Sequence, residues 1–196
     1  MNIFVLDEDP AKAARDLCNK HVVKMIIESA QILSTVYRLA MEERRSLPAK
    51  DAETYPRLYK ATHIHHPVTK WVRSSIHNTD WLWQHLLAIE SEYNARYNQR
   101  REKQYKAWSV IRELDGHRSG IWNGHGDWRL HTPFVQCMPE QYQNQGDAVA
   151  AYRAFYRGEK ARFAKWEPHA AEPTWWAACR RSCRPHDPSQ YSSVIV

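Results

Sequence analysis

Three residues near the amino terminus have side chains that can perform acid–base chemistry together. His21, Lys24 and Glu28 follow one another at steps of three and four residues, and this spacing places them on one face of an α-helix. Within two turns they supply a proton carrier, an electrophile and a base. Gln31 and Thr35 continue the same face. The spacing therefore predicts a helix with one chemically capable side.

The same residues also have a plainer interpretation. Lys24 and Glu28 form an i,i+4 pair, which on any helix contributes only roughly 0.2–0.5 kcal/mol. However, past Asn19 apolar residues cover more than half of the helix circumference, as in a central helix. Polar groups on such a helix are paired or face a cleft, and pKa values are tuned in clefts. We therefore expect the ionisable side to face an enclosed hollow that admits a nucleotide.

The helices that would position these residues follow from caps and periodicity. Asp9 before Pro10 is a favourable start, because the carboxylate accepts from free N–H groups and proline suits the first helical position. Asp147 is a second candidate cap. The predicted helices cover residues 10–18, 19–45, 67–98, 101–114 and 148–166, with loops at 46–56 and 115–133.

These elements predict an all-α fold. We expect one compact helical domain spanning residues 1–196, with a short extended amino-terminal segment, NIFVL, and one long irregular loop, 115–133. Long ordered loops in compact domains tend to be functional. The chain length fits a single domain of ordinary size.

Composition narrows the class of partner. The chain has 28 Lys and Arg against 22 Asp and Glu, a net charge of +6, which suits a polyanion. Nine Trp and ten Tyr against four Phe favour stacking on bases or sugars. The sequence has no glycine-rich phosphate loop, no apolar run of the ~20 residues needed to span a bilayer, and no secretory signal. Four scattered cysteines do not suit a disulfide scaffold. We expect a cytoplasmic monomer.

Histidines and cysteines elsewhere leave a metal site open as an alternative. Imidazole and thiolate are common zinc ligands, but no H-E-x-x-H or paired C-x-x-C spacing accompanies them. We therefore predict no metal and no other cofactor, and we place His66 in an extended turn facing the same cleft. The two groups are His63, His65 and His66, and Cys179, Cys183 and His186.

A second stripe lies on the predicted helix after residue 147. Arg153, Arg157 and Lys160 are spaced by four and three, with Tyr152 and Tyr156 beside them. Cations on one face suit a row of phosphates, and tyrosines can stack on unpaired bases. The alternative is the solvated face of an ordinary surface helix.

Five segments of the chain carry a resemblance to a known group. They are NIFVLDEDPAKAA, KHVVKMIIESAQ, ATHIHHP, TPFVQCMP, and AYRAFYRGEKARFAKW through PTWW. They resemble small phage-associated proteins that are often labelled pyrimidine-dimer DNA glycosylases. These proteins look related to the α-glutamyl/putrescinyl-thymine pyrophosphorylase group, which is associated with hypermodified pyrimidines in phage DNA. That wider group is similar to a bacterial anti-phage defence glycosylase that removes glucosylated hydroxymethylcytosine. The resemblance implies DNA as the partner.

Carried over by position, the resemblance implies a set of site residues. They are Lys20, His21, Lys24, Glu28, Gln31, His66, Asn78, Thr132, Tyr152, Arg153, Tyr156 and Lys160. Together with the residues singled out above, we expect three groups. The catalytic group is Glu28, His21, Lys24 and Asp7; the base pocket is Gln31, His66, Asn78, Thr132, Phe134, Tyr152 and Tyr156; the phosphate-binding group is Lys20, Arg73, Arg153, Arg157 and Lys160.

The function implied is a DNA glycosylase that excises a modified pyrimidine, such as a sugar-bearing 5-hydroxymethyl base, from phage DNA by base flipping. Glu28, with Asp7 behind it, would stabilise the sugar cation or position water; Asp127 in the loop is a third carboxylate that can activate water. His21 and Lys24 would neutralise or protonate the leaving base. Lys24 could instead form a Schiff base and add lyase activity.

Two other functions remain open. The first is a transferase that adds an amino acid or polyamine to activated 5-hydroxymethyluracil in phage DNA. The second is a non-catalytic DNA-binding protein, in which replacing Glu28, His21 or Lys24 would leave the biological effect intact.

Overall fold

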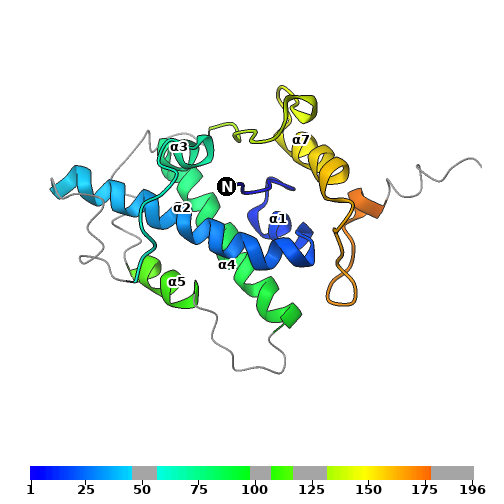
Figure 1. The fold of residues 1–196 in the computed structure, drawn as a ribbon, viewed down its shortest axis with the longest axis horizontal. Coiled ribbons are helices and arrows are strands. Elements are labelled where there is room, and N and C mark those ends of the chain that lie inside the picture. The colour runs from blue at the N-terminus through cyan, green and yellow to red at the C-terminus, as the bar shows by residue number, and fades with distance from the viewer. Residues whose placement is uncertain (46–56, 98–106, 117–131, 178–196) are drawn as a thin grey trace, which may run out of the picture.

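Helices account for the regular secondary structure of the protein (Figure 1). The computed structural model describes residues 1–45, 57–97, 107–116 and 132–177, and no strand occurs in these ranges. The all-α prediction is therefore confirmed. The elements are α1 (Pro10–Asp16), α2 (Asn19–Arg45), α3 (Pro67–Ser74), α4 (Ile76–Tyr97), α5 (Ala107–Gly116), the 3₁₀ turn η1 (Glu140–Tyr142), α7 (Ala148–Phe155) and the π-helix η2 (Tyr156–Lys160).

The long helix α2 is the centre of the fold. It contacts α3, α4 and α5, and Figure 1 shows it crossing α4 through the middle of the molecule. Met25, Ile26 and Leu33 on its apolar face are fully buried. The expectation of a central helix is therefore confirmed. No helix in the described ranges is long and apolar enough to cross a bilayer.

Two predicted caps are present. The Asp9 carboxylate accepts from the backbone N–H groups of Ala11 and Lys12 at 2.8 and 3.1 Å. The Asp147 carboxylate accepts from the N–H of Ala150 at 2.8 Å. Because each cap satisfies N–H groups that the first turn leaves unpaired, the starts of α1 and α7 lie where the sequence places them.

The predicted helix over residues 67–98 is two helices, because Ser75 is extended (φ −153°, ψ 147°). Polar side chains satisfy the backbone groups that this break exposes. The Ser75 hydroxyl accepts from the N–H of His77 at 3.1 Å, and the Asn78 amide donates to the carbonyl of Trp71 at 2.8 Å. Apolar periodicity continues across the break, so the pattern alone does not reveal it.

The helix expected to reach residue 166 changes character at Tyr156. Residues 156–160 form a π-helix, in which backbone hydrogen bonds run from i to i+5. Lys160 accordingly lies over the ring of Phe155, five residues earlier, at 4.3 Å from its centroid. The wider turn therefore rotates Lys160 away from the face that carries Arg153 and Arg157.

The predicted amino-terminal segment NIFVL has no regular secondary structure and is buried. Ile3, Phe4, Val5 and Leu6 are at most 5% exposed, and the amino terminus lies among α1, α2, α3 and α7 (Figure 1). Phe4 has a φ of +43°, a conformation that is strained for a residue with a Cβ. The surrounding side chains hold the segment in this conformation.

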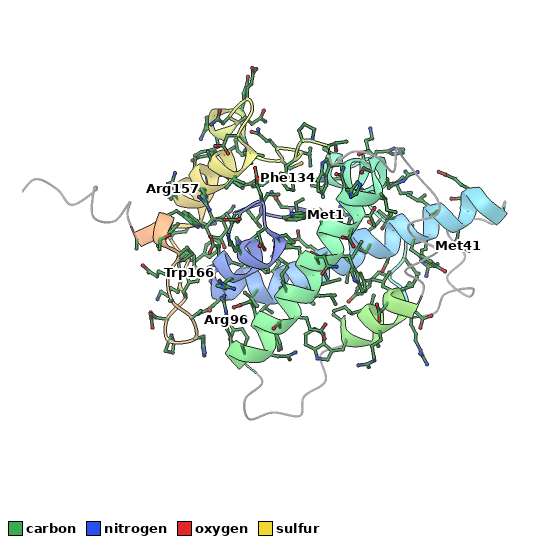
Figure 2. The ribbon with its side chains drawn as sticks, turned by 180° about the vertical axis from the view of Figure 1, so that it is seen from behind. Met1, Met41, Arg96, Phe134, Arg157 and Trp166 are labelled. Carbon is green, nitrogen blue, oxygen red and sulfur yellow. The ribbon has the colours of Figure 1, made fainter. Side chains whose placement is uncertain are left out.

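Arg96, near the end of α4, joins that helix to the end of α1 (Figure 2). Its guanidinium is buried and donates to the carbonyls of Arg15 and Leu17, at 2.9 and 2.8 Å, and pairs with Glu92 at 2.8 Å. These bonds satisfy carbonyl groups at the end of α1, which the helix itself leaves unpaired.

His85 makes the stability of this fold depend on pH. Burial lowers its pKa to about 4, and its Nδ1 lies 2.9 Å from the carbonyl of Pro10. Since an unfolded histidine titrates at about 6.5, the unfolded chain binds more protons between pH 4 and 6.5. We therefore expect the free energy of unfolding to fall as pH falls through this window, by up to about 1.4 kcal/mol per pH unit for this histidine.

The measurement is urea unfolding followed by tryptophan fluorescence at pH 7, 6 and 5. In the His85→Phe variant, the decrease in unfolding free energy with falling pH should be smaller than in the wild type. Equal decreases in the two proteins would contradict the assignment.

Candidate functional site

The residues predicted to act together lie on the side of α2 that meets the amino-terminal segment. One oxygen of Glu28 is 3.2 Å from Lys24 Nζ, and the other accepts from the backbone N–H of Asn2 at 2.9 Å. The Glu28 side chain is 15% exposed and the Lys24 side chain 64% exposed. Glu28 is thus a half-buried carboxylate with both oxygens bonded, and its partner Lys24 is largely exposed to solvent.

His21 is a buried, neutral imidazole. Its ring stacks on Phe4 with centroids 4.5 Å apart, and its Nδ1 lies 2.7 Å from the hydroxyl of Tyr156. Burial, followed by the positive charges of Lys160 and Lys24, lowers the pKa of His21 to about 3. A neutral ring has no charge with which to neutralise a departing base. Any contribution from His21 at neutral pH is therefore that of a hydrogen-bonding or positioning group.

His66 lies in the extended turn that the sequence predicts, where it caps α3. Its Nδ1 accepts from the N–H of Val68 at 3.2 Å. Burial lowers its pKa, the α-amino group of Met1 and His63 lower it further, and Glu28 opposes them. The charge of Glu28 therefore acts on His66. Gln31, one turn beyond Glu28, is half-buried.

Cations gather beside His21, where the start of α2 meets η2. Lys20 Nζ lies 5.2 Å from the centroid of Phe163. Burial lowers the pKa of Lys160, Glu159 opposes this effect, and the charges of Lys24 and Arg162 add to it. The mutual effect of these cations indicates a locally positive surface.

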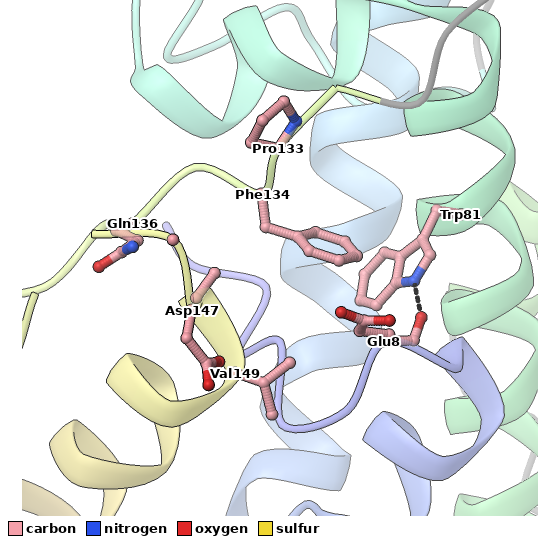
Figure 3. Close-up of a pocket in the computed structure, with 9 residues that line it drawn as sticks. Glu8, Trp81, Pro133, Phe134, Gln136, Asp147 and Val149 are labelled. Carbon is pink, nitrogen blue, oxygen red and sulfur yellow. Dashed lines mark hydrogen bonds between the residues drawn. The ribbon is translucent and has the colours of Figure 1, made fainter. Parts of the chain in front are cut away.

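A cleft of about 720 Å³ opens on the other side of the amino-terminal segment (Figure 3). In the close-up, the Phe134 ring lies edge-on to Trp81, with Glu8 beside Trp81 and Asp147 across the opening. The ring centroids of Phe134 and Trp81 are 5.1 Å apart. The remaining lining residues are Pro133, Gln136, Gly146, Ala148 and Val149. The cleft thus combines aromatic surface with two carboxylates, Glu8 and Asp147.

A second hollow of about 530 Å³ adjoins this cleft, because Glu8, Asp147 and Val149 line both. Asp7, Ala150, Arg153, Arg157 and Trp175 complete it. Asp7 pairs with Arg153 at 3.3 Å, and Arg153 and Arg157 lie 5.5 and 5.8 Å from the centroid of Trp175.

His21, Lys24 and Glu28 line neither of these two hollows. The hollow expected in front of their face of α2 is therefore not one of these cavities. The two regions nevertheless share supporting segments. Asn2, bonded to Glu28, also donates to the carbonyl of Cys137 at 2.8 Å, and the same two segments supply Glu8 and Phe134 to the cleft.

Several residues expected in a base pocket instead support the segment that carries Phe134. The Asn78 amide bonds both the hydroxyl and the N–H of Thr132, at 2.6 and 3.2 Å. The buried Tyr152 donates to the carbonyl of Val135 at 2.9 Å. Tyr156 is also fully buried. Of the predicted pocket residues, Phe134 lines the cleft directly.

The predicted phosphate-binding residues do not form one row. Arg73 pairs with Glu43 at 2.9 Å, at the contact between α3 and α2. Arg153 donates to the carbonyl of Leu6 at 2.8 Å in addition to its pair with Asp7. These bonds hold the fold together. Of the other three cations, Lys20 is exposed, and Arg157 and Lys160 are half-buried.

Sequence reasoning missed Glu8, Trp81 and Trp175 as cleft residues. Glu8 stands beside a capping motif, and Trp81 falls on the apolar face of α4, so neither pattern distinguishes a cleft wall from core. The loop carboxylate Asp127 and the zinc candidates Cys179, Cys183 and His186 lie outside the described residues. Within the described part of the chain, no group of three or more His, Cys, Asp or Glu residues could hold a metal ion.

Comparison with known proteins places the amino-terminal half in a family. A family model described as pyrimidine dimer DNA glycosylase matches residues 1–105, which include α1 to α4 and the residues Asp7, His21, Lys24 and Glu28. No curated protein and no solved structure matches the chain. Since the match covers more than half of the 196 residues, the chain belongs to the pyrimidine dimer DNA glycosylase family.

Proposed function

We propose that the protein excises a modified pyrimidine from phage DNA and leaves an abasic site, with a glucosylated 5-hydroxymethyl base as the first candidate. The observation that carries the proposal is the environment of Glu28. Its carboxylate is 15% exposed and held between Lys24 and the N–H of Asn2, within the part of the chain that the family model matches. The sequence resemblance to glycosylases of modified phage DNA supports the choice of base.

The chemistry of the step explains why such a carboxylate is useful. A base must leave the duplex before its glycosidic bond can be reached. Cleavage then develops positive charge on the deoxyribose and negative charge on the departing pyrimidine. Glu28 would stabilise the sugar cation or position the attacking water. Lys24, 3.2 Å away, would offset charge on the base or attack the sugar carbon as an amine.

The cleft that Phe134 and Trp81 line is the candidate receptor for the extruded base. Its volume of about 720 Å³ lies within the range usual for small-ligand pockets, about 300–1,000 Å³. The two rings, in edge-to-face contact with their planes at 69°, offer apolar surface against which a pyrimidine ring can pack. Glu8 and Asp147 can accept hydrogen bonds from donors on the base or its substituent.

A second candidate function is a transferase that joins an amine to an activated pyrimidine in phage DNA. The observation that favours it is the acidic character of the cleft, where Glu8 and Asp147 lie beside Trp81 and Phe134. Carboxylates and aromatic rings together attract an ammonium group. The two functions differ in requirement, because a transferase needs a pyrophosphorylated base and an amine.

Replacing Glu28 separates chemistry from binding. We expect Glu28→Gln to bind modified DNA as the wild type does and to release base about 100-fold more slowly or worse, because the charge that stabilises the sugar cation is lost. Mass spectrometry of released bases measures the rate, and abasic-site labelling checks the product.

Asp7→Asn is the matched control for Glu28→Gln, because Asp7 is the other candidate carboxylate and pairs with Arg153. Release lost in Asp7→Asn but kept in Glu28→Gln would transfer the catalytic role to Asp7. If wild-type protein releases no base from any modified phage DNA, while linking an amine to a pyrophosphorylated base, the transferase is the function. Effects unchanged by both variants indicate a non-catalytic DNA-binding protein.

Replacing Arg157 and Lys160 tests whether these two cations contact DNA phosphates. Because each phosphate contact contributes about 0.9 to the slope of log affinity against log salt, Arg157→Gln with Lys160→Gln should weaken binding to all sequences and flatten this slope by roughly 2. Fluorescence anisotropy measures the affinity at salt concentrations from about 50 to about 200 mM, and these affinities give the slope. Arg112→Gln, an exposed cation on α5, is the control, and an equal effect there would remove the assignment.

A further inference from the structure

One cluster of residues at the surface contains an aromatic ring, Phe163, to which the proposed function gives no role. Phe163 lies on the turn that follows η2 and is only half-buried. Its ring has Lys20 Nζ at 5.2 Å and the Arg162 guanidinium carbon at 5.7 Å from its centroid. We call Phe163, Lys20, Arg162 and Lys160 the aromatic–cationic patch.

The backbone holds Phe163 in place. Its N–H donates to the carbonyl of Lys160 at 3.0 Å, and the N–H of Ala164 donates to the same carbonyl at 2.8 Å. Two residues later the carbonyl of Lys165 accepts from the N–H of Asn19, at 2.8 Å, at the start of α2. The ring is therefore presented by a turn fixed at both ends, so little conformational entropy is lost when it binds a partner.

The protein itself uses only part of the Phe163 ring. Phe163 packs edge-on against His21, with centroids 5.4 Å apart and planes at 78°. His21 in turn covers Phe4. Phe163 is thus the half-exposed member of a ring cluster that continues through His21 to Phe4 inside the protein.

The charge around the ring is positive. Lys24 and Arg162 each lower the pKa of Lys160, in addition to the effect of burial and against Glu159, so these cations lie within electrostatic reach of one another. Two acids lie nearby: Glu28 pairs with Lys24, and Glu159, which accepts from Tyr142 at 3.1 Å, offsets part of the charge of Lys160. A half-exposed aromatic ring flanked by cations suits a polyanion whose units carry flat rings.

We propose that Phe163 stacks on an unpaired base of DNA while Lys20, Arg162 and Lys160 bind the adjoining phosphates. A base inside an intact duplex has both faces covered by its neighbours, so the ring gains a partner only where a nucleotide is unpaired or extruded. The patch therefore discriminates between DNA with an unpaired site and fully paired DNA. This rests on the proposed function only for the identity of the polymer.

The test compares two duplexes of one sequence, each about 25 base pairs long, which is on the order of the length that a small protein covers. One duplex is fully paired, and the other carries 2-aminopurine opposite an abasic site. Stacking on aromatic side chains contributes about 1–3 kcal/mol per base, or roughly 5- to 150-fold in affinity. Phe163→Ala should weaken binding to the unpaired site by about tenfold or more and leave the paired duplex within about twofold. It should also abolish the change in 2-aminopurine fluorescence.

Phe163→Trp and Tyr93→Ala complete the design. Phe163→Trp keeps a stacking ring and should retain selectivity. Tyr93→Ala removes a half-buried ring that packs against Trp108 on α5 and should change neither affinity, so it controls for lost packing. Thermal unfolding of Phe163→Ala shows whether the variant is folded.

Equal weakening of both duplexes by Phe163→Ala, or no weakening of either, would refute the stacking role. The result is independent of catalysis. Lost selectivity in Phe163→Ala supports the patch even if no base is released, and base release with unchanged selectivity removes the patch while leaving the glycosylase proposal in place.

Discussion

The structure depends on the burial of an amino-terminal segment that belongs to no helix or strand. Its backbone N–H and carbonyl groups are removed from water and need partners from side chains. The Asn2 carboxamide oxygen accepts from the N–H groups of Ile3 and Phe4, at 2.8 and 3.0 Å. Arg153 donates to the carbonyl of Leu6, and Trp81 donates to the carbonyl of Glu8. The last two bonds join α7 and α4 to this extended segment.

This requirement decides which functional groups remain available. Arg153 has the residue type of a phosphate ligand, yet its guanidinium already satisfies Leu6 and Asp7. Breaking such an arrangement would leave buried polar groups unpaired, at a cost of about 1–3 kcal/mol each. Glu28 meets the same segment through the N–H of Asn2, but keeps a partly exposed carboxylate. A bond that orders the fold therefore also orients the candidate catalytic group.

Local patterns predicted the helices well, because caps and apolar periodicity are properties of neighbouring residues. Asp9, Asp147 and the central position of α2 follow from them. The break at Ser75 does not, since apolar periodicity continues across it. The π-helix from Tyr156 does not either, since the Tyr156 hydroxyl bonds to distant groups, the N–H of Cys18 and the ring of His21. The charge of His21 was equally hidden, because burial beneath Phe4 and two neighbouring lysines lower its pKa. Residue types named the chemistry, and tertiary contacts determined which groups can perform it.

Acidic residues line the cleft and basic residues lie near His21, and this separation favours one orientation of bound DNA. The cleft wall carries Glu8 and Asp147, which repel phosphates, while the cations near His21 attract them. In the proposed complex, a DNA backbone would therefore follow Lys20, Lys24 and Lys160 rather than enter the cleft. A neutral base is not repelled by Glu8 and Asp147, so it can enter the cleft while the phosphates stay on the cationic surface. Glu28 and Asn2 lie between the cationic surface and the segments that form the cleft. If the sugar stayed with its phosphates and the base turned inward, the glycosidic bond would be held at this position.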